Sequence, residues 1–348
     1  MINSFRVLVT SVGAVGGGDL AQALIGRGAR VLVADANERA PGLWTPGASR
    51  HLLPHATDPA YETELAALCR QHSPDAIIPM SGIELAGLSR MRISLADAGV
   101  GHMVPPQQTI DVCCDKARLL AALTERVLPT PRTWSPPDLD TIPDRTELLV
   151  RPRRGHAPVY PCHTRDQAAV LCQLVPDPLV QEHFSEEFDE FTADCLVDRD
   201  GRTSVILRRR LWVRGGRSMF GQTFHNDHVT TLVTRAVDAL GLTGACHLTG
   251  VIHHHGEGDR GGVFLTDAEA RPAAGSFFHA QISGASYTEQ LLAVLRDEPV
   301  NHDRLRYRDG YLVRNTEVMA FPESPPAPAV LHPGTRTVPA DVHRDGDL

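Results

Sequence analysis

The first 35 residues constrain the fold most strongly, because an apolar run leads into a glycine turn, a helical stretch and a second apolar run. Residues 6–10 are apolar and β-branched, residues 13–18 contain four glycines, and residues 30–34 resume the strand pattern. We expect a strand, a turn, a helix over Leu20 to Arg27 capped by Asp19, and a second strand. Strands joined through a helix lie parallel, so the sequence predicts a parallel α/β sheet.

The same alternation continues to about residue 105. A helix is expected over residues 59–72 and a strand over residues 75–79, and the two prolines at 105 and 106 would end this unit. A length of 348 residues allows two or three packed units, each with its own core.

The pattern changes after this point. Short elements of mixed type are expected up to residue 180, namely helical segments within 109–125, a strand at 148–151, a helix at 165–174 and a strand at 178–182. Longer, hairpin-like strands follow, at 190–197, 203–211, 245–254 and 263–267, with helices at 227–240 and 286–297. Such strands favour an antiparallel sheet. The segment from residue 322 is rich in proline, glycine and charge, and we expect it to be disordered.

Composition excludes several classes of protein. Lys and Arg total 34 and Asp and Glu total 42, so the formal charge is −8, and no basic block would bind a nucleic acid. Neither a signal peptide nor a membrane-spanning apolar run is evident, so we expect a cytoplasmic protein that does not bind membranes. Seven cysteines without a CxxC pair indicate reduced, buried thiols.

The glycine turn permits a second interpretation. Gly13 to Gly18, with Asp35 after the second strand, could form a dinucleotide site in which backbone amides hold a pyrophosphate and the acid holds a ribose. The spacing differs from G-x-G-x-x-G, because Val15 stands where the second glycine is needed. We therefore favour a structural turn, and an NAD-dependent dehydrogenase is the runner-up among enzymes.

Several further segments occur in a fixed order, namely Asp115-Lys116, Leu128-Pro-Thr-Pro131, Leu149-Val-Arg151-Pro-Arg153, Val180 to Phe184 and Thr266 to Arg271. With the opening unit, the series resembles the ATP-grasp superfamily, particularly its carboxylate–amine ligases and the synthetase units of carbamoyl phosphate synthetase, to about residue 321. The resemblance implies a combined α/β and α+β fold. Its parts would be a Rossmann-like pre-ATP-grasp domain (1–105), a small ATP-grasp lobe (106–180), a large lobe with a metal site (181–321) and the tail (322–348).

The resemblance implies that Lys116, Arg151 and Arg153 hold the phosphates of ATP. Taken alone, Lys116 would be an ordinary solvated helix residue. Arg151 replaces the commoner lysine, as in the synthetase units named above, and an arginine can donate two hydrogen bonds to a phosphate. The loop after Arg153 has one glycine, Gly155, where the family has several.

By the same resemblance, the hinge between the lobes would hold adenine through Gln181, Glu182, His183 and Phe184. Glu190 would bind the ribose. Phe188 stands where the family has a glycine, and the spacing is two residues longer than usual.

The metal motif of the family is Glu-x-Asn-x-Arg, and here Asp267-Ala-Glu269-Ala-Arg271 stands in its place. Strand alternation puts these three side chains on one side, and carboxylates are good ligands for Mg²⁺. The further acid that the family has upstream is not evident near His247 or Thr249. The resemblance gives Arg271 and Arg210 catalytic roles at the transferred phosphoryl group, and Arg210 shares a strand face with Arg208.

The resulting hypothesis is a biosynthetic, ATP- and Mg²⁺-dependent ligase that forms an amide or peptide bond through an acyl phosphate. Its substrates would be a small carboxylate and a small amine, and dimers are common in the family, so a homodimer is one assembly that the resemblance implies. The alternative is a degenerate ATP-grasp protein that binds a nucleotide or metabolite without catalysis, which the poor glycine loop and the altered metal motif favour.

Two other interpretations are weaker. His253 and His255, with Cys246 and His247, could bind a transition metal, but only alternate residues of a strand share a face, so a solvated strand edge is favoured. A hydrolase is poorly supported, because there is no G-x-S-x-G and the Cys113-Cys114 pair lies in an expected helix.

Overall fold

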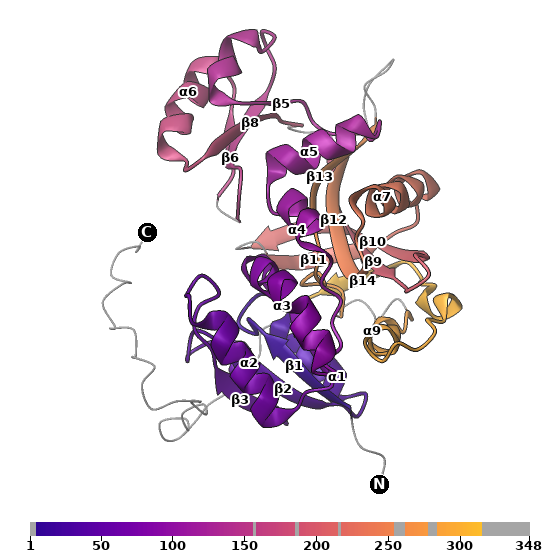
Figure 1. Ribbon diagram of the computed structural model, residues 1–348. Coiled ribbons are helices and arrows are strands. Elements are labelled where there is room, and N and C mark those ends of the chain that lie inside the picture. Colours follow the sequence, from indigo (N-terminus) through magenta and orange to yellow (C-terminus); the bar gives the residue numbers. More distant parts are fainter. Residues whose placement is uncertain are drawn as a thin grey trace.

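The computed structural model describes residues 5–155, 158–184, 188–214, 217–253, 262–277 and 284–314. The strands of this part of the chain form three sheets. In Figure 1 the first sheet lies at the bottom, the small second sheet at the top, and the large third sheet to the right of both.

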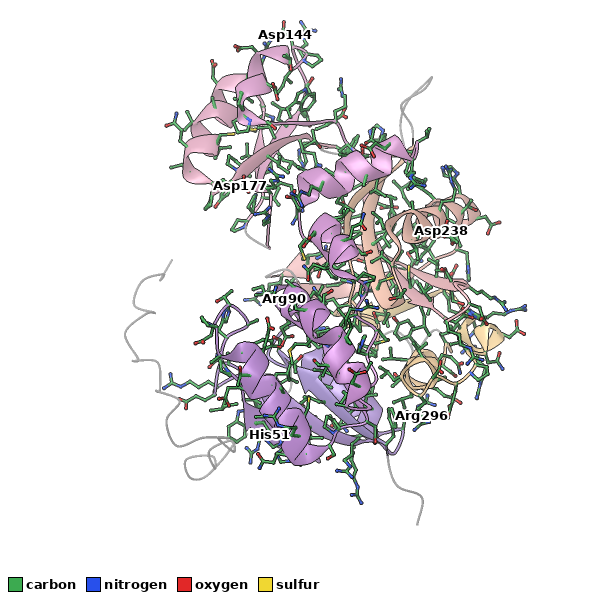
Figure 2. The ribbon with its side chains drawn as sticks, in the orientation of Figure 1. His51, Arg90, Asp144, Asp177, Asp238 and Arg296 are labelled. Carbon is green, nitrogen blue, oxygen red and sulfur yellow. The ribbon has the colours of Figure 1, made fainter. Side chains whose placement is uncertain are left out.

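The first sheet has the strand order β3-β2-β1-β4, and all of its strand pairs are parallel. Its elements and their neighbours are β1 (Arg6–Thr10), α1 (Gly17–Ile25), β2 (Arg30–Asp35), η1 (Pro41–Trp44), β3 (Ser49–Leu52), α2 (Tyr61–His72), β4 (Ala76–Pro79), η2 (Gly82–Glu84) and α3 (Leu85–Asp97). The parallel sheet predicted from the sequence is therefore confirmed, although β3 and α3 were not predicted. Arg90, labelled in Figure 2, lies on α3 and pairs with Glu62 of α2 at 2.6 Å.

The predicted cap of α1 is wrong. The helix begins at Gly17 after Gly16, whose φ of 86° lies in the left-handed region that glycine adopts without strain. Asp19 lies inside the first turn, and its Oδ2 accepts a hydrogen bond from Arg314 at 2.6 Å. An acid in the first turn still interacts favourably with the helix dipole.

The second sheet is small and antiparallel, with the order β5-β8-β6-β7. The elements of this stretch of chain are α4 (Gln107–Cys113), α5 (Lys116–Glu125), β5 (Thr133–Trp134), η3 (Pro136–Thr141), β6 (Leu148–Pro152), β7 (Tyr160–Cys162), α6 (Arg165–Leu174) and β8 (Pro178–Glu182). Helix α6 and strand β8 have the predicted bounds.

The third sheet has six antiparallel strands in the order β13-β12-β9-β10-β11-β14. The elements of this part are β9 (Phe188–Val197), β10 (Thr203–Arg214), β11 (Arg217–Thr223), α7 (Asp227–Leu240), β12 (Gly244–His253), β13 (Gly262–Glu269), α9 (Tyr287–Leu295), η4 (His302–Leu305) and β14 (Gly310–Val313). The antiparallel prediction is confirmed, and β11 and β14 were missed. Residues 254–261, which link the predicted strands at 245–254 and 263–267, and the segment from residue 322 lie outside the described residues.

Helices α4, α5 and α7 pack on the large sheet, because their buried side chains share one core with it. Leu119 and Leu123 of α5 belong to that core, whereas the sequence grouped this helix with the small sheet. Strand β9 shows how the sheet separates core from cavity: Phe191, Ala193 and Cys195 are fully buried on the helix side. The alternate residues between them are polar and point to the other side.

None of the helices within the described ranges is both long enough and apolar enough to span a membrane.

Glu84 is a buried acid at the edge of the first sheet. It is only 2% exposed, and it accepts hydrogen bonds from the Tyr61 hydroxyl at 2.7 Å and the Thr10 hydroxyl at 3.1 Å. Burial raises the pKa of Glu84 to about 7, although these hydrogen bonds oppose the shift.

This shift predicts a pH effect on stability. At pH values between the usual carboxyl pKa and about 7, the folded chain keeps a proton at Glu84 that the unfolded chain releases. The free energy of unfolding should therefore fall as the pH rises through this range. Glu84→Gln should remove that part of the pH dependence. Urea unfolding of both proteins at pH 5 and pH 7 measures this pH dependence. An equal change in the free energy of unfolding between the two pH values in both proteins would contradict the assignment.

Candidate functional site

A cavity of about 970 Å³ lies where the three sheets meet. Its volume is at the upper end of the roughly 300–1,000 Å³ that is usual for small-molecule sites. The first sheet contributes the glycine turn and the residues after β4, namely Ala14, Val15, Met80, Ser81 and Gly82. The small sheet contributes one face of β6 and β8, and the large sheet contributes its polar face, residues 273–275 and Arg314.

Two cations meet one acid at the side of this cavity. Lys116 is the first residue of α5, and its Nζ lies 3.7 Å from Oδ2 of Asp267 on β13. Arg151 lies on β6, and its Nη2 lies 3.5 Å from the same oxygen. Lys116 also donates a hydrogen bond of 2.9 Å to the Gly155 carbonyl. The three charged side chains are at most 16% exposed, so water screens their interaction less than it would at the surface.

Asp115 fixes the start of α5 and therefore the position of Lys116. Its carboxylate caps the helix by accepting from the Arg118 amide, and it also accepts from Arg153 at 2.7 Å and Arg154 at 3.1 Å. Burial alone would raise the pKa of Asp115, but these hydrogen bonds outweigh it and the pKa is lowered. The structure thus places Arg153 at the helix cap and not in the cavity wall, unlike Arg151.

A β-bulge at Thr266 aims the acids of β13. In the pairing with β12, one residue is unmatched between Leu265 and Asp267, so the alternation of buried and exposed residues changes phase there. Leu265 faces the core before the bulge and Ala268 faces it afterwards. Thr266 and Asp267 both line the cavity as a result, and Glu269 follows Asp267 on the same side.

Glu269 is held by its neighbours. Its Oε2 lies 2.6 Å from Nε of Arg271, and its Oε1 lies 3.8 Å from Nε2 of His247. Nδ1 of His247 donates to the Arg271 carbonyl at 2.9 Å. Burial lowers the pKa of His247, which favours the neutral imidazole.

The strand beside the acids carries no third carboxylate. His247 lies opposite Glu269 and Thr249 lies opposite Asp267, so these are the positions where an upstream acid would complete the site. Within the described ranges no cluster of three or more His, Cys, Asp or Glu side chains is arranged to hold a metal ion. The acids at hand for a metal are therefore the pair Asp267 and Glu269.

Strands β9 and β10 add two ion pairs to the wall. Arg210 pairs with Glu190 at 2.5 Å, and both line the cavity. Arg208 pairs with Asp194 through two hydrogen bonds of 2.5 and 3.1 Å, and Ser276 donates to the same carboxylate at 2.7 Å. The sequence analysis did not select Asp194, although its spacing from Glu190 along a strand puts both on one face.

The four hinge residues Gln181, Glu182, His183 and Phe184 all line the cavity. The amide of Glu182 donates to the Arg132 carbonyl at 2.8 Å, and the amide of His183 donates to the carbonyl at position 147 at 2.9 Å. Phe184 stacks on Phe264 with the ring centroids 4.7 Å apart. This end of the cavity is the more apolar one, since Leu149, Phe188 and Val251 also line it.

The glycine turn packs within the protein. Asp35 accepts a hydrogen bond of 2.7 Å from the Gly13 amide, so this acid closes the turn. A Cβ at Gly16 would lie 2.5 Å from the Ala274 carbonyl, which explains the glycine by close approach to the large sheet. A second cavity, of about 290 Å³, lies beside the turn and shares Ala14 with the first. The turn therefore serves the packing of the chain, as the favoured interpretation predicts.

The remaining sequence candidates separate in the structure. Cys246 is fully buried, and His247 lines the cavity on the other side of the sheet. His253 ends β12, and His255 lies outside the described residues. Burial raises the pKa of both Cys113 and Cys114, in agreement with packed thiols.

The sequence matches no protein-family model and no curated protein. Solved structures with similar folds include the L-amino acid ligase from Bacillus licheniformis, with a TM-score of 0.69 and 17% identity over 88% of this chain and 78% of that one. The biotin carboxylase domain of the Hydrogenobacter thermophilus 2-oxoglutarate carboxylase has a TM-score of 0.68 and 14% identity, covering 88% and 73%. The N5-carboxyaminoimidazole ribonucleotide synthetase from Thermus thermophilus has a TM-score of 0.67 and 16% identity, covering 89% and 82%.

The chain has the ATP-grasp fold. At these sequence identities the similarity concerns the fold alone. The biotin carboxylase structure contains MgADP, ADP and bicarbonate. The mixture of one parallel and two antiparallel sheets in this chain agrees with the ATP-grasp fold. What the cavity does in this chain must be argued from its own side chains.

The buried pair of Arg208 and Asp194 predicts a large effect on stability. Arg208→Met leaves a carboxylate that is 0% exposed without its cation, so the free energy of unfolding should fall by about 3–5 kcal/mol. Arg209→Met is the matched control, because Arg209 pairs with Asp189 at a partly exposed position, with side chains that are 31% and 30% exposed, and it should cost about 1–2 kcal/mol at most. Denaturant unfolding compares the two variants, and equal losses would contradict this account of the wall.

Proposed function

We propose that this chain is an ATP-dependent ligase that joins a carboxylate to an amine through an acyl phosphate, with Mg²⁺ at the phosphates. The observation that carries the proposal is the convergence of Lys116 and Arg151 on Asp267, with Glu269 and Arg271 beside them. Phosphoryl transfer needs positioned cations and metal-binding acids more than a dedicated base, and this cavity offers both.

The proposal includes an assignment of domains. Residues 1–105 would be the Rossmann-like pre-ATP-grasp domain, residues 106–180 the small lobe and residues 181–321 the large lobe. The three sheets support this division, except that α4 and α5, within residues 106–180, pack on the large sheet. Strand β8 runs to Glu182 within the small sheet, so the small lobe would extend to that residue.

The phosphate end of the site is suited to an anion. Arg151 is a buried cation whose Nε has no hydrogen-bond partner among the described residues. Burial lowers its pKa, and the charge of Asp267 only partly opposes this. A phosphate oxygen would supply the missing acceptor and a second negative charge. Lys116, held at the start of α5, would bind the same group as a point charge.

The donor set is also suited to Mg²⁺. In nucleotide sites Mg²⁺ is usually bound by one or two carboxylates together with phosphates and water, which matches the pair Asp267 and Glu269. When bound, the ion would neutralise phosphate charge and align the terminal phosphoryl group for transfer. Asp267 would then exchange its present ion pairs for the metal, while the two cations turn to the phosphates.

The remaining chemistry falls to the substrates and to the arginines around them. A carboxylate oxygen of the acid would attack the terminal phosphorus, the bond from that phosphorus to ADP would break, and the amine would then displace phosphate from the acyl carbon. The amine proton would leave to solvent. Arg271 would hold the transferred phosphoryl group, and Arg210 would support it from β10.

The hinge and Glu190 complete the proposed nucleotide site. The apolar end of the cavity has room for a base near Gln181 to Phe184, and Glu190 would bind the ribose. Because Glu190 is paired with Arg210, it would need to share its oxygens between the sugar and the guanidinium.

The alternative proposal is a binding protein without catalysis. His247 and Thr249 occupy the strand positions that face the two acids, so a metal there would have fewer carboxylate ligands than the resemblance implies. Binding of the nucleotide would survive this change, whereas turnover depends on the metal.

Thermal unfolding with ligands tests the proposal. Because a ligand that binds only the folded state raises its stability, ATP with Mg²⁺ should raise the Tm, ATP alone should raise it less, and NAD should not change it. Asp267→Asn combined with Glu269→Gln should abolish the part of the Tm increase that depends on Mg²⁺. Asp189→Asn, on the other side of β9, is the matched control and should keep the full response.

The outcomes separate the candidates. Release of ADP that requires both an acid and an amine would support the ligase, and a Tm shift without any such release would support the binding protein. Absence of an ATP response in the wild-type protein would contradict both, and a shift with NAD alone would favour a dehydrogenase.

A further inference from the structure

His247 is a buried imidazole beside the acids of the proposed metal site. It lies on β12, and its direct partner on β13 is Glu269, so the two side chains share the face that lines the cavity. The next residue, Leu248, is fully buried in the core on the opposite face, as strand alternation requires. His247 itself is only 8% exposed. Strand pairing therefore holds this ring against the cavity.

One hydrogen bond fixes which ring nitrogen of His247 carries the proton. Nδ1 lies 2.9 Å from the carbonyl oxygen of Arg271, and a carbonyl can only accept, so the proton of the neutral ring is on Nδ1. Nε2 then has a lone pair to offer, and it makes no hydrogen bond within the described ranges. Histidines that bind metals in proteins are usually held in this way, with the other ring N–H donated to a carbonyl or a carboxylate.

The gap between His247 and Glu269 fits a metal ion. Oε1 of Glu269 lies 3.8 Å from Nε2, which is too far for a hydrogen bond. Metal bonds to imidazole nitrogen or carboxylate oxygen are roughly 2.0–2.2 Å long, so one ion could contact both atoms across this gap. The two side chains are 10% and 13% exposed, so a cation between them would be little screened by water.

Asp267 would be the third protein ligand of this ion. The three side chains do not form a ready-made metal cluster among the described residues. Asp267 contacts Lys116 and Arg151 instead, and it would turn to the metal once phosphates bind those cations.

The other position of β12 that faces the acids offers a weaker ligand. Thr249 lies opposite Asp267, and its hydroxyl is hydrogen-bonded to the Thr266 hydroxyl at 3.1 Å. Carboxylates and imidazoles are the usual protein ligands of divalent ions in such sites, and a neutral hydroxyl is not. His247 is therefore the group on this strand that adds to the two acids.

We propose that Nε2 of His247 is a ligand of the metal, and that the site favours a transition-metal ion such as Mn²⁺ over Mg²⁺. The inference rests on the proposed metal at the phosphates and names the class of ion. Imidazole nitrogen binds divalent transition metals well, whereas Mg²⁺ prefers oxygen ligands and gives up its waters reluctantly. Mg²⁺ would still bind through the two acids and the phosphates, but without the contribution of His247.

Pulsed EPR on the protein with Mn²⁺ and a non-hydrolysable ATP analogue tests the ligand directly. A coordinated imidazole nitrogen modulates the electron-spin echo of Mn²⁺, and we expect this signal in the wild-type protein but not in His247→Asn. The asparagine amide can still donate to the Arg271 carbonyl, so the variant removes the ligand nitrogen and keeps a donor for that hydrogen bond.

Calorimetry with the same analogue measures the preference between the ions. The Kd with Mg²⁺ divided by the Kd with Mn²⁺ should be roughly tenfold lower in His247→Asn than in the wild type. Comparing the two proteins removes the difference that the nucleotide itself makes between the ions. His225→Asn is the matched control, because His225 is exposed and stacks on Tyr307 away from the cavity lining, and it should keep both the signal and the ratio.

The outcomes separate this inference from the proposed function. Wild-type protein that binds Mn²⁺ with the nucleotide but gives no nitrogen signal would overturn the inference. A signal that persists in His247→Asn, or a ratio of Kd values that does not change, would overturn it as well. Failure of the wild-type protein to bind the nucleotide with either ion would instead contradict the proposed function.

Discussion

The contact of Asp267 with Lys116 and Arg151 is the interaction on which the site depends. It joins α5 and β6 to β13, elements that are far apart in the chain, across the cavity between the small and large sheets. Two cations and one carboxylate, all nearly removed from water, sum to a charge of +1, so Asp267 holds both cations in place but offsets only part of their charge. Phosphate and metal could replace these contacts without new charged residues, in agreement with the phosphate site proposed above.

The geometry of the large sheet makes this contact accessible. Along β9 the small and apolar residues face the helices while Glu190 and Thr192 line the cavity, so a single strand supplies both core and site. The bulge at Thr266 then turns Asp267 to the same side. On the same polar face, Asp194 and Arg208 are buried away from water, and their two hydrogen bonds satisfy each other's charged groups.

Much of the fold followed from the sequence, because strand and helix periods are local properties of the chain. The bounds of α6, α7 and β8 agree with the predictions, and so do the parallel and antiparallel classes of the sheets. Packing was less predictable: α5 joins the large sheet, and Arg153 turns to the cap of that helix, since both outcomes depend on contacts between distant segments.

The central claim is that phosphates and Mg²⁺ replace the ion pairs of Asp267. A crystal structure with Mg²⁺ and a non-hydrolysable ATP analogue tests it most directly. Our account predicts that Nζ of Lys116 and the guanidinium of Arg151 leave Asp267 for phosphate oxygens, and that Asp267 and Glu269 contact the metal. A nucleotide bound elsewhere, with both cations still on Asp267, would contradict it.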